Sequence, residues 1–328
     1  MRPCNERKIS TAGKPSPYPR SVIDVRHVTR RFDGVTALED ASFEVRSGEI
    51  VALLGPNGAG KTTASRIIGG ILAPSEGDVL VDAVSVRQDP NTVRARCGFV
   101  TDQPSLYERM PLSAYLEFFA RLYDVSAPGA RAVELARLLG LDDVLGKRLG
   151  AFSRGMRQKV AIARALVHDP PVLLLDEPAT ALDPEMAQTL RSFIVSLRAR
   201  HRAILLTTHD LDEAQRIADR VVVLYKGRVI RIGATSEIRA VGKPSYTVTF
   251  AGEPAAAHAA LARIGVASDP APSEDGLGAL RFATDDPRKT NSEALRALLD
   301  AGLRVVTVTA AERSLEDAYL AILAEARQ

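Results

Sequence analysis

The sequence predicts an α/β fold with a mixed sheet at its core. Three continuous apolar runs lie at residues 50–54, 171–175 and 203–206, and such runs are typical of parallel strands that are covered on both faces. Helix-compatible stretches separate these runs, and the first run leads directly into a glycine-rich loop that opens a helix. This alternation indicates a doubly covered sheet with its functional loops at one edge.

The glycine-rich loop spans residues 55–63 and fits the pattern G-x-x-x-x-G-K-[ST]. Glycines let successive backbone N–H groups turn around anionic oxygens, and the following helix N-terminus favours negative charge. A turn that matches by chance is the alternative, but the strand before the loop and the helix after it favour phosphate binding. The loop consists of Gly55, Pro56, Asn57, Gly58, Ala59, Gly60, Lys61, Thr62 and Thr63. In this pattern Lys61 reaches the β- and γ-phosphates of a nucleotide, and the Thr62 hydroxyl holds Mg²⁺.

The bulk composition is that of a globular protein with ample apolar material for a core, at 46% hydrophobic and 25% charged residues over 328 positions. A net charge of +3 is small for this length and gives no argument for nucleic acid. The two cysteines, Cys4 and Cys97, indicate neither a disulfide framework nor a metal cluster, which fits a reducing cytoplasm.

No apolar run approaches the roughly 18 residues that a membrane helix needs. The first twenty residues combine prolines with basic residues and lack the apolar core of a signal peptide, so we expect a flexible tail at 1–20.

Before and after the loop the pattern favours strands. Residues 22–51 alternate apolar and polar side chains around turn residues at 33–34 and 47–48, which predicts an antiparallel sheet. A strand pair is expected around residues 77–82, and the strand at 97–100 leads into a polar loop.

Residues 112–145 have apolar positions at helical spacing, which predicts an inserted helical subdomain at about 104–165. Its aromatic stripe is explained either as core or as a groove for a partner helix. Alternation of strands and helices then returns, and we expect the main domain, residues 21–240, to close after the strand pair at 221–232.

Residues 241–328 are predicted to form a small α+β domain of ferredoxin-like type, in which nothing indicates catalysis. Ser314 and Asp317 make a capping box for its last helix. The expected order is strand 245–250, helix 254–264, loop 268–272, strand 279–284, helix 292–301, strand 304–309 and helix 314–326.

Three further stretches carry candidate chemistry. Asp176 and Glu177 end an apolar strand, where Asp176 would bind Mg²⁺ and Glu177 would orient the attacking water, unless the pair only caps a helix. Ser153 and Gly155 open a later helix, where they receive an anion or Ser153 is an ordinary N-cap. His209 ends another strand, where it is either structural or a hydrogen-bond partner of a γ-phosphate.

Taken together, these stretches resemble the ATP-binding subunit of ATP-binding-cassette (ABC) transporters over residues 22 to about 239. The motifs occur in that family's order: Walker A at 55–62, signature at 152–156, Walker B with the catalytic glutamate at 172–177, D-loop at 181–183 and switch histidine at 209. The resemblance implies a P-loop NTPase fold that binds and hydrolyses ATP with Mg²⁺.

The same resemblance assigns further residues. Phe32 matches the aromatic platform that stacks on adenine, with a buried strand-end phenylalanine as the alternative. Asp183 belongs to the D-loop. The signature departs from the family's Leu-Ser-Gly-Gly-Gln, but Ser153 and Gly155 remain. In the Q-loop the glutamine position falls on Asp102 and Gln103 stands one place later, so both are candidates for the contact with Mg²⁺ and water.

The resemblance also implies partners. Walker A of one cassette faces the signature of another, so two identical chains would form a two-fold, head-to-tail pair around two ATP. An integral-membrane permease on a separate chain would be driven from the cytoplasmic face of the membrane. The signature, residues 107–110 and the C-terminal stretch are similar to ABC-2-type exporter ATPases. The alternative is a soluble cassette ATPase in translation or DNA repair, but the chain has one cassette and no strong basic patch.

Overall fold

The computed structural model describes residues 21–180, 182–273, 276–311 and 314–327. Its centre is a six-stranded sheet in the order β10-β9-β3-β8-β7-β6, in which only β10 is antiparallel to its neighbour. The predicted mixed sheet is therefore confirmed. The strands are β3 (Ile50–Leu54), β6 (Cys97–Val100), β7 (Val172–Asp176), β8 (Ala203–Thr208), β9 (Arg220–Tyr225) and β10 (Arg228–Ala234).

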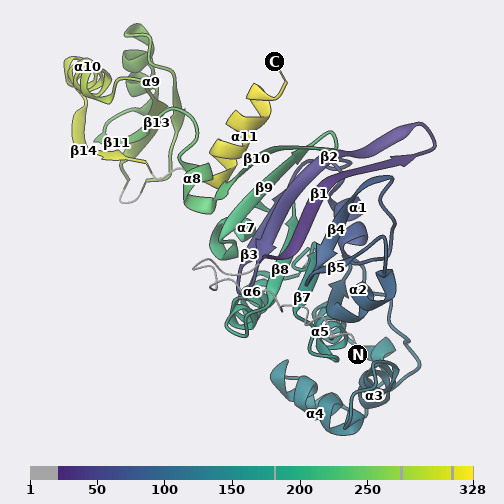
Figure 1. The fold of residues 1–328 in the computed structure, drawn as a ribbon. Coiled ribbons are helices and arrows are strands. Elements are labelled where there is room, and N and C mark those ends of the chain that lie inside the picture. The colour runs from purple at the N-terminus through teal and green to yellow at the C-terminus, as the bar shows by residue number, and fades with distance from the viewer. Residues whose placement is uncertain (1–20, 181, 274–275, 312–313, 328) are drawn as a thin grey trace, which may run out of the picture.

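A second, fully antiparallel sheet of order β2-β1-β4-β5 lies beside the first, as the alternating pattern predicted (Figure 1). Side chains of β3 alternate between two cores, because successive residues of a strand point to opposite faces. Val51 and Leu53 pack with the antiparallel sheet and helix α1, whereas Ile50, Ala52 and Leu54 pack with the helices on the other face. The strands and helix are β1 (Ser21–Phe32), β2 (Val35–Arg46), β4 (Glu76–Val81), β5 (Val84–Ser85) and α1 (Lys61–Ile68).

The predicted inserted helices form one end of the molecule, with α3 and α4 farthest from the C-terminal sheet (Figure 1). The core interpretation of the aromatic stripe holds for Tyr115, which is buried, whereas Phe118 and Leu122 are exposed and the groove for a partner helix stays a prediction. The helices of residues 21–240 other than α1 are α2 (Pro90–Arg96), α3 (Leu112–Leu122), α4 (Pro128–Leu138), α5 (Arg154–Leu166), α6 (Pro184–Arg198), α7 (Leu211–Ile217) and α8 (Thr235–Arg239), with short 3₁₀ turns at Asp142–Val144 and Leu149–Ala151.

A third sheet of order β12-β13-β11-β14 has a core of its own beneath α9 and α10. The prediction of a loop at 268–272 is wrong in part, because residues 268–270 form β12 and pair with β13. As an edge strand, β12 tolerates its proline, Pro270. Helix α10 begins five residues before the expected start, because Asp286 caps it and accepts from Lys289 N at 3.1 Å. The elements are β11 (Ser245–Ala251), α9 (Pro254–Arg263), β12 (Ser268–Pro270), β13 (Gly278–Ala283), α10 (Pro287–Asp300) and β14 (Arg304–Ala310).

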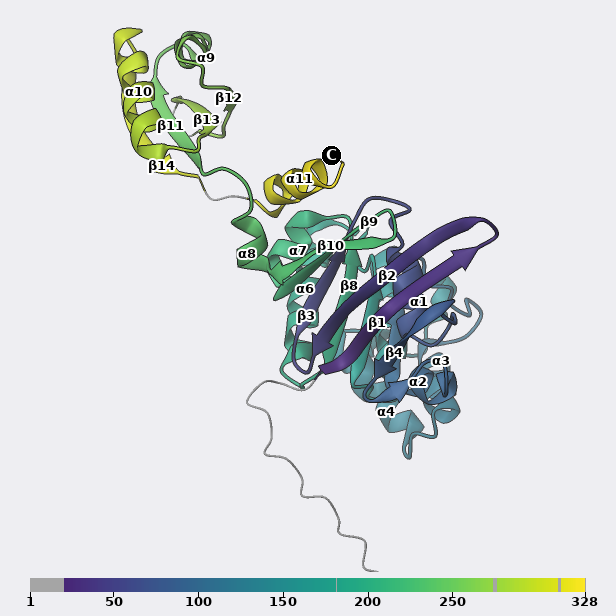
Figure 2. The same cartoon turned by 45° about the horizontal axis from the view of Figure 1, so that its top comes forward.

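The last helix, α11 (Leu315–Glu325), packs on the nucleotide-binding half of the chain, as Figure 2 shows beside α7 and α8. Leu315, Ala318 and Ile322 join the core cluster of the central sheet. The Leu315 amide also donates to Oε1 of Gln215 in α7 at 2.6 Å. The chain thus leaves the central sheet after α8, forms the third sheet and returns.

Two absences concern only the described residues. Within that part of the chain, no helix is both long and apolar enough to cross a bilayer. Cys97 is a free, buried cysteine, and burial raises the pKa of its thiol to about 12. Cys4 and the tail expected at 1–20 lie outside the described residues.

Candidate functional site

The glycine-rich loop connects β3 to α1, as the motif predicted, and two of its glycines are required sterically. A Cβ at Gly55 would lie 2.4 Å from the Leu224 carbonyl oxygen, and a Cβ at Gly60 would lie 2.4 Å from the Ala37 oxygen. Gly58 and Gly60 also have φ values of +78° and +106°, which L side chains rarely adopt. The loop is therefore held tightly between β9 and β2.

A cavity of about 320 Å³ lies over this loop. Its lining includes residues 57–63 together with Asp102, Asp176 and Glu177. These residues come from three separate segments, which the central sheet brings together at the carboxyl ends of β3, β6 and β7, and Ala37 of β2 completes the lining. The crevice is the one that an open α/β sheet provides for ligands.

Lys61 lies almost completely buried at the floor of this cavity. Its Nζ donates to the carbonyl oxygens of Gly55 at 2.7 Å and Pro56 at 3.2 Å. Burial lowers the pKa of the ammonium group, while the charges of Glu177 and Asp176 oppose part of that lowering. The group is a desolvated cation aimed at the site, which suits an anionic phosphate.

Asp176 ends β7 and accepts a hydrogen bond from the Thr207 hydroxyl on neighbouring β8. Glu177 follows with φ of +50°, and its amide donates to the Thr207 carbonyl oxygen at 2.9 Å. The helix-capping alternative for this pair is wrong, because Asp183 caps α6 by accepting from Met186 N at 2.8 Å.

His209 lies one residue beyond β8 and its Nδ1 is 2.8 Å from Oε2 of Glu177. The same Oε2 accepts from the Thr180 hydroxyl at 3.0 Å. The His209 side chain is 61% exposed, whereas that of Glu177 is 16% exposed. The carboxylate is thus fixed from two sides, with one partner at the surface.

The two Q-loop candidates line different cavities. Asp102 lines the phosphate cavity with Lys61 and Thr62. Gln103 lines a neighbouring cavity with Arg154 and Arg157, and only Asp102 belongs to both. Asp102 is therefore the candidate that the geometry places beside the phosphate loop.

The signature lies apart from this cavity within one chain. Ser153 caps α5 by accepting from Met156 N at 3.3 Å, so the N-cap alternative holds, and no described residue of 152–157 lines the phosphate cavity. Asp183 is also absent from that lining. Of the D-loop, Ala181 lies outside the described residues.

Phe32 ends β1 beside the turn to β2, and its side chain is 41% exposed, so the buried alternative is wrong. The Arg30 guanidinium carbon lies 4.4 Å from the ring centroid. Phe32 is not among the lining residues of the phosphate cavity, although Ala37 from the paired strand is.

Three residues around the site, Ala37, Thr180 and Thr207, were not expected from the sequence. Thr207 carries a signal, since it follows the apolar run at 203–206 and lies two residues before His209. Ala37 carries none, because an alanine in a strand does not reveal that its carbonyl oxygen approaches a glycine.

The donor set fits a nucleotide-borne Mg²⁺ better than a resident ion. Thr62 and Asp176 supply oxygen donors, as Mg²⁺ prefers. Within the described residues there is no group of three His, Cys, Asp or Glu side chains that could hold a metal. Mg²⁺ at such a site keeps waters and takes phosphate oxygens as ligands.

The fold and loop define a P-loop ATPase, and comparison with known proteins identifies its family. Residues 38–180 match the ABC transporter family. The ATP-binding protein NatA of Bacillus subtilis is 39% identical over 224 residues, which are 66% of this chain and 91% of NatA. The Nod factor export ATP-binding protein I of Burkholderia orbicola is 38% identical over 65% of this chain and 70% of that protein. The sulfate/thiosulfate import ATP-binding protein CysA of Pseudomonas aeruginosa is 37% identical over 70% of this chain and 72% of that protein.

Solved structures agree with this family. One is the ATP-binding subunit of an ABC transporter, with a TM-score of 0.62 and 34% identity over 67% of this chain and 92% of that one. Another is the dimeric post-hydrolysis cassette MJ0796 bound to ADP and Pi, with a TM-score of 0.60 and 26% identity over 65% and 98%. The chain belongs to the ATP-binding subunits of ABC transporters and is an ATPase.

Proposed function

We propose that this chain powers an exporter: two copies bind two MgATP at their shared interface, and hydrolysis drives a separate integral-membrane permease from the cytoplasmic face. The observation that carries the catalytic part is the convergence of Lys61, Asp176 and Glu177 on one cavity. The proposed roles of Phe32, Ser153, Gly155 and Asp183, which do not line this cavity, rest on the family resemblance.

In the proposed mechanism the loop amides and Lys61 hold the phosphates, while Thr62, Asp176 and Asp102 would hold Mg²⁺, which would supply neutralisation of the phosphate charge. Glu177 orients and polarises the attacking water, and His209 and Thr180 keep its carboxylate in place. Phe32 offers its exposed ring to adenine without reading the base edge.

The proposed dimer follows from the separation of the two half-sites. Ser153 and Gly155 stand apart from the phosphate cavity of their own chain, so they are available to the γ-phosphate held by a second copy. Because each chain has one half of each kind, a two-fold pair completes two identical sites. Loss of the γ-phosphate contacts would then open the pair.

A permease contact is proposed at a second groove, formed by the end of α1, β6, α3 and α5. A cavity of about 290 Å³ lies there, with Phe119 and Tyr123 on one side and the cations Arg94 and Arg164 at its edge. Exposed apolar side chains adjoin it, since Tyr107 packs on Phe118 and Phe119. An amphipathic permease helix with acidic residues fits such a lining.

The export direction rests on resemblance. The signature and residues 107–110 are similar to those of ABC-2-type exporters, and relatives at similar identity are named for both export and import. Within the chain, we assign residues 21–240 to the cassette, 104–165 to its helical part and 241–328 to an accessory region whose last helix returns to the cassette.

The catalytic proposal is tested by Glu177→Gln, which keeps the side-chain shape but removes the base. With ATP and Mg²⁺ we expect this variant to elute as a dimer and to lose hydrolysis by about a hundredfold or more. Glu185→Gln, an exposed change on α6, is the control. A variant that stays monomeric with ATP, or that hydrolyses at the normal rate, contradicts the proposal.

The partner is tested by purifying the tagged chain from detergent-solubilised membranes of its host. A stoichiometric polytopic protein supports the permease proposal. Ribosomes or DNA without a membrane partner would contradict it and leave the ATPase chemistry in place.

A further inference from the structure

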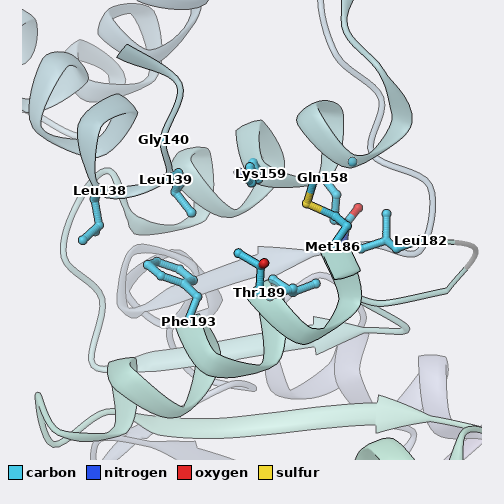
Figure 3. Close-up of a pocket in the computed structure, with 11 residues that line it drawn as sticks. Leu138, Leu139, Gly140, Gln158, Lys159, Leu182, Met186, Thr189 and Phe193 are labelled. Atoms are coloured by element: carbon cyan, nitrogen blue, oxygen red, sulfur yellow. The ribbon is translucent and has the colours of Figure 1, made fainter. Parts of the chain in front are cut away.

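A separate cavity of about 250 Å³ lies between the end of α4, the first turns of α5 and the first half of α6 (Figure 3). In this view Met186, Thr189 and Phe193 project from α6 toward Leu139 and toward α5. This cavity, called here the α4–α6 cavity, shares no described lining residue with the phosphate cavity. It is therefore distinct from the phosphate cavity, although its lining includes Gly155 of the proposed signature half-site.

The walls of the α4–α6 cavity are mostly apolar, and among the described residues they include one buried donor without a partner. Gln158 lines the cavity and is only 6% exposed, yet its Nε2 has no hydrogen-bond partner among the described residues. A buried donor without a partner costs free energy, so an acceptor placed there is favoured. The Thr189 hydroxyl is already committed, because it donates to the Glu185 carbonyl oxygen at 3.0 Å.

We propose that the α4–α6 cavity binds a small aromatic molecule with one acceptor, to which Gln158 Nε2 donates a hydrogen bond. An engineered apolar cavity of about 150 Å³ holds benzene, so this larger space admits a substituted ring. Phe193 and the Met186 thioether are favourable neighbours for an aromatic ring. Lys159 at the same wall disfavours a cationic ligand and tolerates an acceptor.

The bound molecule would act on hydrolysis through two shared residues. Gln158 and Leu182 also line the neighbouring cavity that contains Asp102 and Thr180. Thr180 in turn donates to Glu177. A ligand would also hold α5 against α6. These helices are already close at Gly155, since a Cβ added there would lie only 3.1 Å from Met186 Cγ. Because it fixes this spacing, we expect it to slow ATP turnover, a consequence that rests on the proposed function.

The binding test uses acetophenone and α-methylstyrene, which share a shape but differ in that only acetophenone carries a carbonyl acceptor. The readout is methyl NMR of the full chain with ¹³C-methyl methionine, which gives few signals because the sequence has four methionines. Met186→Leu assigns the signal at the cavity. Both compounds should shift the Met186 methyl saturably, and acetophenone should bind about threefold to tenfold more tightly.

Two matched variants isolate the donor. Gln158→Leu should bring the affinity ratio of the two compounds close to one while still binding α-methylstyrene, which also shows that the variant is folded. Thr189→Val removes the other hydroxyl of the lining and should leave the ratio unchanged. A Met186 signal that neither compound shifts overturns the site, and equal affinities in the native chain overturn the role of Gln158.

Hydrolysis is measured at saturating acetophenone, where we expect kcat to fall at least twofold. Full binding with an unchanged kcat overturns the coupling and leaves the site in place. A chain that hydrolyses no ATP without any ligand would contradict the proposed function, whereas the methyl shifts and the affinity ratio would still decide the binding proposal.

Discussion

His209 Nδ1 lies 2.8 Å from Glu177 Oε2, although the two residues follow different strands, β8 and β7. The contact forms because these strands are parallel neighbours, which end at the same edge of the sheet. The exposed imidazole thereby holds a mostly buried carboxylate at the phosphate cavity. We propose on this geometry that His209 positions Glu177.

We therefore expect His209→Ala to lower kcat for ATP by about a hundredfold, the order found when one oriented polar group is removed from an active site. ATP affinity should change little, because the lysine and loop amides remain. His209→Gln keeps a donor and should recover part of the rate, and Asp212→Ala, an exposed neighbour, serves as the control. Steady-state ATPase kinetics measure both parameters, and a normal kcat for His209→Ala would show that the contact is dispensable.

The Q-loop candidates give a second prediction. Asp102 lines the phosphate cavity and Gln103 does not. Asp102→Asn should therefore raise the Mg²⁺ concentration for half-maximal hydrolysis by about tenfold, as loss of a metal's supporting group does. Gln103→Ala should leave that concentration unchanged. A Mg²⁺ titration of ATPase activity compares the two variants, and the reverse result would assign the role to Gln103.

The difference between these neighbours shows where sequence reasoning ends. The central sheet could be predicted because its apolar runs are continuous, and the phosphate loop because its glycines have a fixed spacing. Asp102 and Gln103 lie in an irregular loop, where spacing does not determine the direction of a side chain.

The C-terminal region shows the same limit. Its main strands follow from alternation, whereas β12 is only three residues long and contains a proline, so its pattern is that of a loop. The start of α10 does carry a signal, Asp286 before Pro287, although the predicted helix begins five residues later. The packing of α11 on α7 and α8 could not be predicted, because an apolar helix face does not identify its partner.

A third prediction concerns the loop glycines. Gly60→Ala should destabilise the chain by about 2–5 kcal/mol, since the new Cβ combines a strained φ with a contact of 2.4 Å to the Ala37 oxygen. Gly58→Ala is the matched control, because its Cβ meets open space and only the backbone term of about 1–2 kcal/mol remains. Thermal unfolding followed by circular dichroism compares them. Equal losses would mean that the Ala37 contact relaxes without cost.

Glu213 gives the last prediction, because this carboxyl on α7 is only 2% exposed. Its Oε2 accepts from the Thr208 hydroxyl at 3.0 Å, whereas Oε1 has no partner among the described residues. Burial raises its pKa from 4.5 to about 7; Thr208 and Arg191 oppose this, and Asp210 and Glu177 add to it.

A carboxyl whose pKa is higher in the folded than in the unfolded chain stabilises the fold fully below pH 4.5, and this contribution is lost as pH rises to about 7. Glu213→Gln keeps an acceptor for Thr208 and carries no charge, so it should be more stable than the native chain at pH 8, by up to roughly 3 kcal/mol. Near pH 4.5 the two should be almost equal. Urea unfolding at both pH values measures the difference, with Glu185→Gln as the exposed control. A gain that is the same at both pH values would show that Glu213 does not titrate between them.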